Sequence, residues 1–280
     1  SVFTAGDVNG DGFSDVLVGS KFYDSGQPGE GAAYLYTGFA AGLSSSSDWT
    51  AESDQSSASF GWSVSSAGDV NGDGYSDVLI GARYFDNGEV DEGRAFLYKG
   101  SGAGLSANAS WTAEGGQTNS QLGFSVSTLG DVNGDGFSDV IIGAPLHDNG
   151  ETDEGLVFVY YGSASGLPAG YNWYAEGNQA SSNFGWSVST AGDVNGDGYS
   201  DVIVGAVNFD NGQTDEGAAF VYHGSANGLI FPAVPNWIAE SNQAGALLGI
   251  SVSTAGDVNG DGYSDVIVGS RNFDNPQPDE

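Results

Sequence analysis

The chain has 280 residues, with 37 Asp plus Glu against 5 Lys plus Arg and therefore a formal net charge of −32. This charge excludes a nucleic acid as partner, because phosphates are bound by a basic surface, and it disfavours anionic membranes for the same reason. Cysteine is absent, which excludes a disulfide framework, and no apolar run approaches the roughly 20 residues of a membrane-spanning helix. Divalent cations are the natural partners of such a surface, although acidity also keeps exported proteins soluble.

Internal repetition dominates the chain. The string Asp-Val-Asn-Gly-Asp-Gly begins at five places, and successive copies start 62 residues apart except for the last pair, which are 64 apart. The two extra residues fall within 230–235, before Trp237. A fixed period of this length is the signature of a repeat architecture. The copies start at Asp7, Asp69, Asp131, Asp193 and Asp257.

Four short strands are predicted in each repeat. In the second copy they are the alternating segment Phe60–Gly68, the apolar run Asp77–Ala82, the segment Arg94–Tyr98 after a polar turn, and Trp111–Glu114. Four such strands make one antiparallel sheet of blade size, and no segment has a useful helical period. Because one sheet cannot bury both faces alone, the copies are expected to stack.

We therefore predict an all-β protein: a β-propeller-type array of four-stranded antiparallel blades, about four and a half in this chain, in a single domain over 1–280. The approximate blades are 1–59, 60–121, 122–183, 184–247 and 248–280, the last being incomplete. Phe-Gly pairs at Phe60 and Phe184, with Leu-Gly in the other copies, suggest close packing near the axis. A recurring Trp is interpreted as core between blades, with a stacking platform for sugar rings as the alternative; it stands at Trp49, Trp111, Trp173 and Trp237.

The Asp-rich loop has the composition of a calcium site. In the second copy, oxygen-bearing side chains stand at loop positions 1, 3, 5 and 9, namely Asp69, Asn71, Asp73 and Asp77, and the carbonyl of Tyr75 would complete the set. Calcium takes six to eight hard oxygen ligands in flexible geometry. The first half matches an EF-hand loop, but the Glu at position 12 and the flanking helices are missing.

The alternative is an Asn-Gly turn with unpaired acids. Five copies with all four side-chain positions intact argue against it, because each loop without a cation would crowd three carboxylates together. We expect about five calcium ions, one per loop, in the role that disulfides play elsewhere. This hypothesis implies millimolar calcium and therefore an extracellular or cell-surface location.

The motifs resemble the FG-GAP repeat of the integrin α-subunit propeller and of secreted bacterial proteins. The likeness rests on the Phe-Gly pair, on Gly-Asp-Val-Asn-Gly-Asp-Gly-Tyr-Ser-Asp-Val-Ile-Val-Gly-Ala at 192–206, and on Gly-Ala-Ala-Phe-Val-Tyr at 217–222. It implies four-stranded blades with calcium in the loop between the first two strands. The side-chain ligands that it implies are Asp7, Asn9, Asp11, Asp15, Asp69, Asn71, Asp73, Asp77, Asp131, Asn133, Asp135, Asp139, Asp193, Asn195, Asp197, Asp201, Asp257, Asn259, Asp261 and Asp265. The carbonyl ligands are those of Phe13, Tyr75, Phe137, Tyr199 and Tyr263.

The sequence departs from a closed propeller, because five Asp loops accompany only four copies of the third and fourth strands. It starts at Ser1 inside a predicted first strand, without a signal peptide, and stops at Glu280 after a predicted second strand, so we expect a mature product or a fragment. Either the chain is a piece of a larger propeller, or another chain completes the fifth blade by strand addition. Repeated end to end, that addition would give a filament.

Enzyme chemistry finds little support in the sequence. His147 and His223 occupy non-equivalent repeat positions and are interpreted as surface variation, and no Gly-x-Ser-x-Gly nucleophile motif is present. A second acidic cluster, such as 148–155, recurs five times and is interpreted as a solvated hairpin turn, with a second cation site or a ligand-facing loop as alternatives.

The predicted function is a non-catalytic, calcium-binding extracellular scaffold for adhesion or surface recognition, with a protein partner or copies of itself. The first alternative is a structural subunit of an extracellular homo-oligomer or filament in which a neighbouring chain completes the open blade. The second is a carbohydrate-binding lectin that uses the Trp residues to bind a glycan. A propeller fold alone does not decide between them.

Overall fold

Antiparallel strands make up the fold. The computed structural model describes residues 1–274, in which twenty strands occur and no helix. The strands form four four-stranded sheets and two two-stranded sheets. Because residues 1–274 contain no helix, nothing in them corresponds to a helix long and apolar enough to cross a membrane.

The four-stranded sheets and the sheet of β19 and β20 follow the repeats, with antiparallel strands in chain order. We call them blades 1 to 5. Blade 1 contains β1 (Val2–Gly6), β2 (Asp15–Ser20), β3 (Ala32–Tyr36) and β6 (Trp49–Glu52), with the ribbon β4 (Gly38–Phe39) and β5 (Gly42–Leu43) in the connection before β6. Blade 2 contains β7 (Phe60–Gly68), β8 (Asp77–Ala82), β9 (Arg94–Tyr98) and β10 (Trp111–Glu114). Blade 3 contains β11 (Ser125–Gly130), β12 (Asp139–Ala144), β13 (Leu156–Tyr160) and β14 (Trp173–Glu176). Blade 4 contains β15 (Phe184–Gly192), β16 (Asp201–Ala206), β17 (Ala218–Tyr222) and β18 (Trp237–Glu240), and blade 5 contains β19 (Leu248–Gly256) and β20 (Asp265–Ser270).

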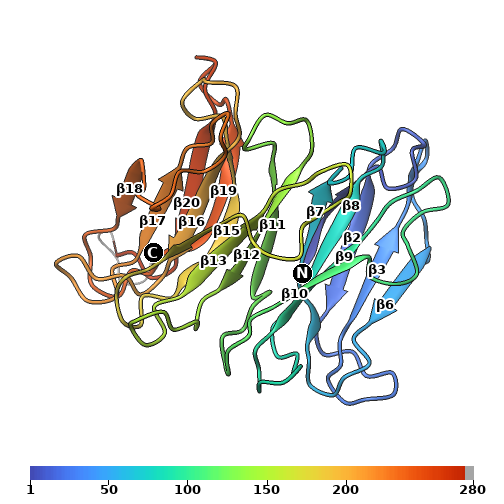
Figure 1. The fold of residues 1–280 in the computed structure, drawn as a ribbon, viewed down its shortest axis with the longest axis horizontal. Helices are drawn as coiled ribbons and strands as arrows, with labels where there is room; N and C mark the ends of the chain where they lie inside the picture. The colour runs from blue at the N-terminus through green and yellow to red at the C-terminus, as the bar shows by residue number, and fades with distance from the viewer. Residues whose placement is uncertain (275–280) are drawn as a thin grey trace.

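The blades succeed one another across the molecule in chain order (Figure 1). The first strands of neighbouring blades lie beside one another, from β1 and β7 through to β15 and β19. This arrangement confirms the predicted all-β array of four-stranded blades, and β7 to β10 have the bounds predicted from the sequence. The last part of the predicted fifth unit, with all of the fifth copy of the second acidic cluster except Asp274, falls on residues 275–280, outside the described residues.

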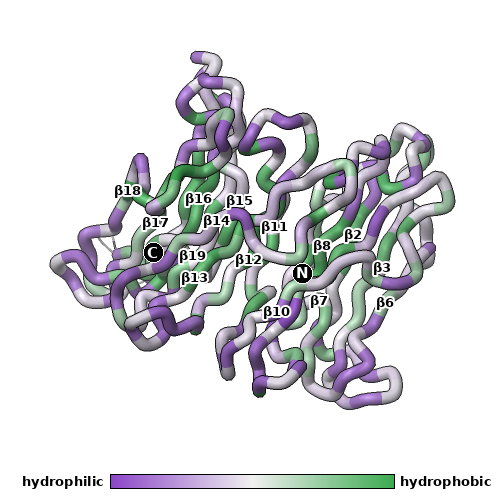
Figure 2. The backbone as a smooth tube through the Cα atoms, viewed as in Figure 1, coloured by the Kyte–Doolittle hydropathy of each residue, from purple (hydrophilic) through white to green (hydrophobic). Residues whose placement is uncertain are grey.

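Packing between blades explains the apolar second strands. Every residue of β8, β12 and β16 is buried, because each of these strands is covered on both faces by neighbouring blades. Figure 2 shows these strands as hydrophobic segments between hydrophilic connections. Four hydrophobic clusters lie one at each interface between successive blades, so the core is divided into nearest-neighbour layers, as in other repeat proteins.

The Phe-Gly pairs lie where two blades approach most closely. Phe60 is fully buried, and Gly61 has a φ of +76° that favours glycine. A Cβ atom built on Gly19 of blade 1 would lie 2.1 Å from the carbonyl oxygen of Gly61 in blade 2. The predicted close packing is confirmed, since neither position accommodates a side chain without moving the backbone of its neighbour.

Three of the four recurring Trp side chains lie between blades, as predicted. Trp49 packs edge-on against Tyr98 of blade 2, with ring centroids 4.8 Å apart, and its Nε1 donates to the carbonyl of Ser106 at 3.0 Å. Trp111 and Trp173 repeat this contact on the next blades. Their rings are therefore engaged by protein; Trp173 is buried, whereas Trp49 and Trp111 remain partly exposed. The prediction is wrong for Trp237, which is 44% exposed, because blade 5 has no third strand within the described residues to cover it.

Candidate metal centres

Each Asp loop is a tight turn held by its own side chains. In blade 2, Asp69 accepts hydrogen bonds from the backbone N–H groups of the fourth, fifth and sixth loop residues at 2.7, 3.1 and 2.7 Å. Asn71 Oδ1 accepts from the N–H of Asp73 at 2.9 Å, and Asp73 Oδ1 accepts from that of Tyr75 at 3.1 Å. The same bonds occur in the other four loops, so five copies of one sequence adopt one conformation.

The ninth loop residue is a buried carboxylate that fixes the loop to the sheet. Asp77 is fully buried, and its two oxygens accept hydrogen bonds from the N–H groups of Val70 at 3.1 Å and Gly100 at 2.9 Å. Burial raises the pKa of Asp77 to about 6, and that of its blade 3 counterpart Asp139 to about 7, and the other acids of each loop add to the effect. A nearby cation would oppose this penalty on the ionised form.

Neighbouring Asp loops are fastened to one another. The N–H of Ser76 in blade 2 donates to the carbonyl oxygen of Asp7 in blade 1 at 2.9 Å. The ring of Tyr75 covers Gly10, so that a Cβ atom built on this glycine would lie 2.7 Å from Tyr75 Cε1. The next three interfaces repeat both contacts, and in them Phe137 covers Gly72, Tyr199 covers Gly134 and Tyr263 covers Gly196. The seventh loop residue thus has a packing role that its predicted carbonyl role did not suggest.

The three carboxylates of each loop repel one another, as expected, but their oxygens do not converge on one point. Within residues 1–274, the one group of three carboxylates with oxygens within 4.8 Å of one another is Glu30, Glu52 and Asp54, which lies elsewhere. The first loop carboxylate turns onto backbone N–H groups, and the ninth is buried behind the loop, which keeps the acids apart. The donor set nevertheless fits calcium, since the potential side-chain ligands of each loop are carboxylate and amide oxygens on a short turn that its glycines permit.

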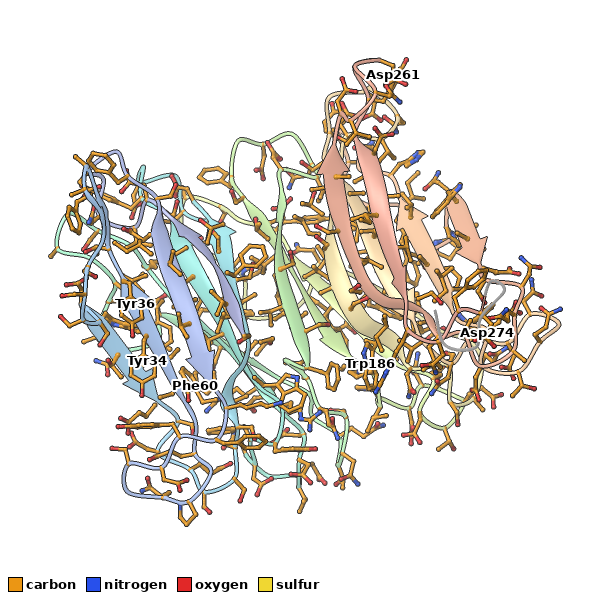
Figure 3. The ribbon with its side chains drawn as sticks, turned by 180° about the vertical axis from the view of Figure 1, so that it is seen from behind. Tyr34, Tyr36, Phe60, Trp186, Asp261 and Asp274 are labelled. Atoms are coloured by element: carbon orange, nitrogen blue, oxygen red, sulfur yellow. The ribbon has the colours of Figure 1, made fainter. Side chains whose placement is uncertain are left out.

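The second acidic cluster lies at the opposite end of each blade, as Asp261 and Asp274 show for blade 5 in Figure 3. Its interpretation as a merely solvated turn is wrong in one respect, because its last glutamate is buried. In blade 2, Glu92 is 2% exposed and accepts hydrogen bonds from the N–H groups of Asn87 at 2.7 Å and Gly116 at 3.0 Å. The carboxylate is therefore the internal scaffold of the turn.

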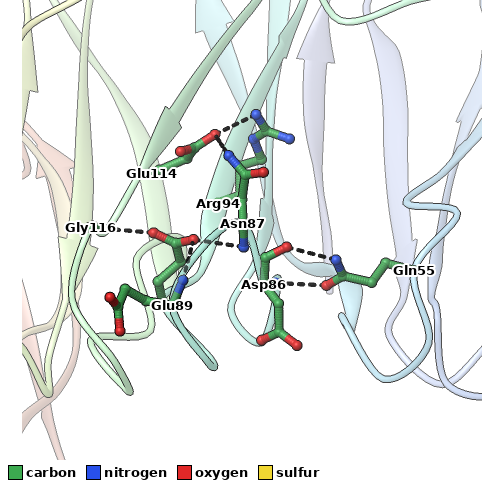
Figure 4. Close-up of polar contacts among 8 residues, drawn as sticks. Gln55, Asp86, Asn87, Glu89, Arg94, Glu114 and Gly116 are labelled. Atoms are coloured by element: carbon green, nitrogen blue, oxygen red, sulfur yellow. Dashed lines mark hydrogen bonds and ion pairs between the residues drawn. The ribbon is translucent and has the colours of Figure 1, made fainter.

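A glutamine that sequence reasoning missed joins these turns across each interface. Gln55 follows the last strand of blade 1, donates through Nε2 to the carbonyl of Asp86 at 2.8 Å, and accepts from the N–H of Asp86 at 2.7 Å (Figure 4). The pair of bonds imitates one rung of a β-ladder. Its recurrence at the repeat period was the available signal, and the other pairs are Gln117 with Asp148, Gln179 with Asp210 and Gln243 with Asp274.

His147, Lys21 and Arg83 pack against aromatic rings. His147 is half-buried, with its ring 5.8 Å from that of Phe158, so its interpretation as surface variation is wrong. Burial lowers the pKa of His147. Lys21 and Arg83 lie over the ring of Trp62 at 3.7 and 3.2 Å from its centroid, a favourable contact of a cation with an aromatic face.

Comparison with known proteins agrees with this geometry. The family model for the FG-GAP repeat matches residues 1–36, 60–98, 122–160, 184–222 and 248–279, each span beginning at the first strand of a blade or up to three residues before it. Two solved structures are similar only in outline. The exotype rhamnogalacturonan lyase YesX has a TM-score of 0.43 at 14% identity, with coverage of 96% of this chain and 55% of the lyase. The rhamnogalacturonan lyase YesW has a TM-score of 0.44 at 13% identity, with coverage of 92% and 56%. Neither likeness is close enough to bear on function.

Curated relatives include several integrin α-subunits. Integrin alpha-V of Gallus gallus is 35% identical over 216 residues, which are 73% of this chain and 20% of that protein. Integrin alpha-5 of Xenopus laevis is 32% identical over 240 residues, 82% of this chain and 22% of that protein. The chain thus spans about a fifth of the length of these relatives. With five matched repeats, each carrying the same Asp loop between the first two strands of a blade, the chain belongs to the FG-GAP repeat family.

Proposed function

We propose that this chain is a calcium-binding interaction scaffold without catalytic activity. The observation that carries the proposal is the fivefold recurrence of one loop conformation with an all-oxygen donor set. The first, third, fifth and ninth side chains and the seventh carbonyl of each loop would hold one calcium ion, giving the ligand set predicted above. A catalytic centre is usually unique, whereas the acidic motifs here recur in every blade.

Calcium would stabilise the contacts between neighbouring blades. In blade 1, the carbonyl of Asp7 accepts a hydrogen bond from Ser76 of the next loop. An ion that orders the loop of blade 1 therefore also orders the carbonyl oxygen of Asp7, which accepts the hydrogen bond from blade 2. Calcium binding to the folded state alone stabilises it by mass action, by about 2.7 kcal/mol per site at a hundred times the dissociation constant. Such a requirement fits an extracellular or cell-surface setting with about millimolar calcium.

The integrin relatives support a role in adhesion or surface recognition, with a protein as partner. A second candidate is self-association, which is supported by β20: among described strands it pairs with β19 alone, and Ile267 on it is 62% exposed. Either residues that follow in a longer chain or a neighbouring copy would cover that edge. Light scattering in millimolar calcium separates the two, because a monomer contradicts self-association and a discrete oligomer or growing polymer supports it.

Calcium stoichiometry tests the metal sites. Asp73 is exposed and bonds only within its loop, so D73A is expected to remove one bound calcium ion while leaving the blade folded. The control is Q117A, at the other end of the blade, which is expected to keep the wild-type stoichiometry. Retention of every calcium ion by D73A, or the absence of binding at millimolar calcium, would overturn the proposal.

A further inference from the structure

Three carboxylates converge at the end of blade 1 that lies opposite its Asp loop. Glu30 precedes β3, Glu52 ends β6, and Asp54 follows two residues later. Their carboxylate oxygens lie within 4.8 Å of one another. Three like charges at this separation repel one another unless a cation or protons intervene.

The innermost member of the trio has an unsatisfied oxygen. Glu30 is fully buried, and its Oε1 accepts hydrogen bonds from the N–H groups of Ser25 at 2.6 Å and Gln27 at 3.5 Å. Its Oε2 is buried and has no hydrogen-bond partner among the described residues. Buried polar atoms of this kind are rare and call for a partner. Glu52, half-buried beside it, likewise accepts no hydrogen bond from residues 1–274. Glu216 of blade 4 also has an unpartnered Oε2, but Asn242 stands there at the position of Asp54, so only blade 1 brings a third carboxylate to the unpartnered oxygen.

At the same place in blade 2, both glutamates have protein partners. The equivalent of Glu30 is Glu92, whose Oε2 accepts a hydrogen bond from the N–H of Gly116 at 3.0 Å. The equivalent of Glu52 is Glu114, which accepts from the side-chain amide of Asn87 at 2.7 Å and forms an ion pair with Arg94 (Figure 4). A guanidinium therefore supplies the positive charge at this place in blade 2.

Blade 1 lacks both side-chain partners of the outer glutamate. One repeat earlier, Ser25 replaces Asn87 and Ala32 replaces Arg94, so the two donors to the outer glutamate are absent. Asp54 replaces Gly116 and adds a third carboxylate to the pair. All three changes act in one direction, because each removes positive or donor character or adds negative charge.

We propose that Glu30, Glu52 and Asp54 form a further divalent-cation site that binds calcium and is distinct from the five Asp loops. The trio offers only carboxylate oxygens, and it opens to solvent through Asp54, so water would complete the six to eight ligands that calcium takes. The ion would neutralise the trio as Arg94 does in blade 2 and would give Glu30 Oε2 its partner. The site would tie the end of β6 to the turn before β3.

Equilibrium dialysis with radioactive calcium at pH 7.5 tests the site, because it compares stoichiometries and does not depend on how many Asp loops are filled. The E52Q/D54N variant changes side chains that are half-buried and exposed, and it is expected to bind one calcium ion fewer than the wild type. In EDTA the same variant is expected to be more stable than the wild type, since it relieves the repulsion. A merely structural role of Glu52 and Asp54 predicts the opposite change in stability.

Two further variants test whether the lost ion belongs to the blade 1 site. S25N/D54G introduces the amide donor of blade 2 and removes the third carboxylate, so the amide of S25N should reach Glu52 and this variant too should bind one ion fewer. E240Q is the matched control: Glu240 occupies the position of Glu52 in blade 4, but it accepts a hydrogen bond from the Asn211 amide at 2.6 Å and should not be a ligand. An unchanged stoichiometry in both blade 1 variants would overturn the proposal, as would the loss of an ion in E240Q.

Discussion

Replacing Gly72 by alanine tests whether the Asp loops of neighbouring blades support one another. Gly72 has a φ of +73°, and a Cβ atom at this position would lie 2.7 Å from Cε1 of Phe137 in the next blade. The left-handed backbone costs about 1–2 kcal/mol for a non-glycine residue. Fitting a methyl group against a packed ring costs about 1–3 kcal/mol more. G72A is therefore expected to lose about 2–5 kcal/mol of unfolding free energy.

The matched control lies two residues away in the same loop. Gly74 has a φ of +88°, but a Cβ atom there would meet nothing within 4 Å, so G74A should lose only the backbone cost of about 1–2 kcal/mol. Urea unfolding followed by tryptophan fluorescence, in calcium and in EDTA, measures both variants. A double-mutant cycle with F137A isolates the contact, because alanine at residue 72 should cost less once the ring is gone. Equal losses for G72A and G74A, or a coupling energy near zero in the cycle, would refute the idea that the ring holds the two loops together.

Three other outcomes are expected. Chelation with EDTA should lower the urea midpoint of the wild type, by an amount that rises with the calcium concentration of the reference sample, and an unchanged midpoint would count against stabilisation by calcium. In EDTA, lowering the pH from 8 to 5 should stabilise the protein. Burial raises the pKa of Asp77 in the folded state to about 6 and that of Asp139 to about 7, so the folded state binds protons that the unfolded state releases above pH 4. The urea midpoint of the D77N/D139N variant should therefore depend less on pH than that of the wild type. H147F should raise the melting temperature more at pH 5 than at pH 7.5, because burial lowers the pKa of His147. Phenylalanine fits this position, since blades 2 and 4 have Phe85 and Phe209 there. An equal gain at both pH values would contradict the burial of His147 as the cause.

The sequence was sufficient for the strands because the repeat supplied the register. The alternation in Phe60–Gly68 and the apolar run Asp77–Ala82 recur with the same spacing, so one unit predicted all the others. Trp237 was mispredicted because its burial depends on a neighbouring blade, which the local pattern does not contain. His147 was mispredicted for a related reason, since its ring substitutes for a phenylalanine that packs on the third strand.

The composition of the Asp loops was predictable, but the arrangement of their charges was not. Spacing alone placed Asp69, Asp73 and Asp77 around one centre. It did not show that Asp77 is also buried, with its two oxygens accepting hydrogen bonds from the backbone N–H groups of Val70 and Gly100. Tertiary contacts that join the loop to the connection after the third strand are long-range and leave no local trace. The convergence of Glu30, Glu52 and Asp54 was equally invisible, since it joins the ends of two strands.

Differences between blades carry information that the repeat itself does not. Every complete blade buries one glutamate in its second acidic turn, and each therefore faces the same cost for a buried charge. The glutamate beside it has a guanidinium and an amide as partners in blade 2, and the amides of Asn149 and Asn211 in blades 3 and 4, although Oε2 of the buried Glu216 in blade 4 has no partner. Blade 1 has none of these donors and carries an additional carboxylate at Asp54. The negative charge at this end of the blade is therefore balanced by a side-chain cation in blade 2, by neutral donors in blades 3 and 4, and in our proposal by a bound ion in blade 1. A position that departs from the repeat is thus where a specialised site is to be sought.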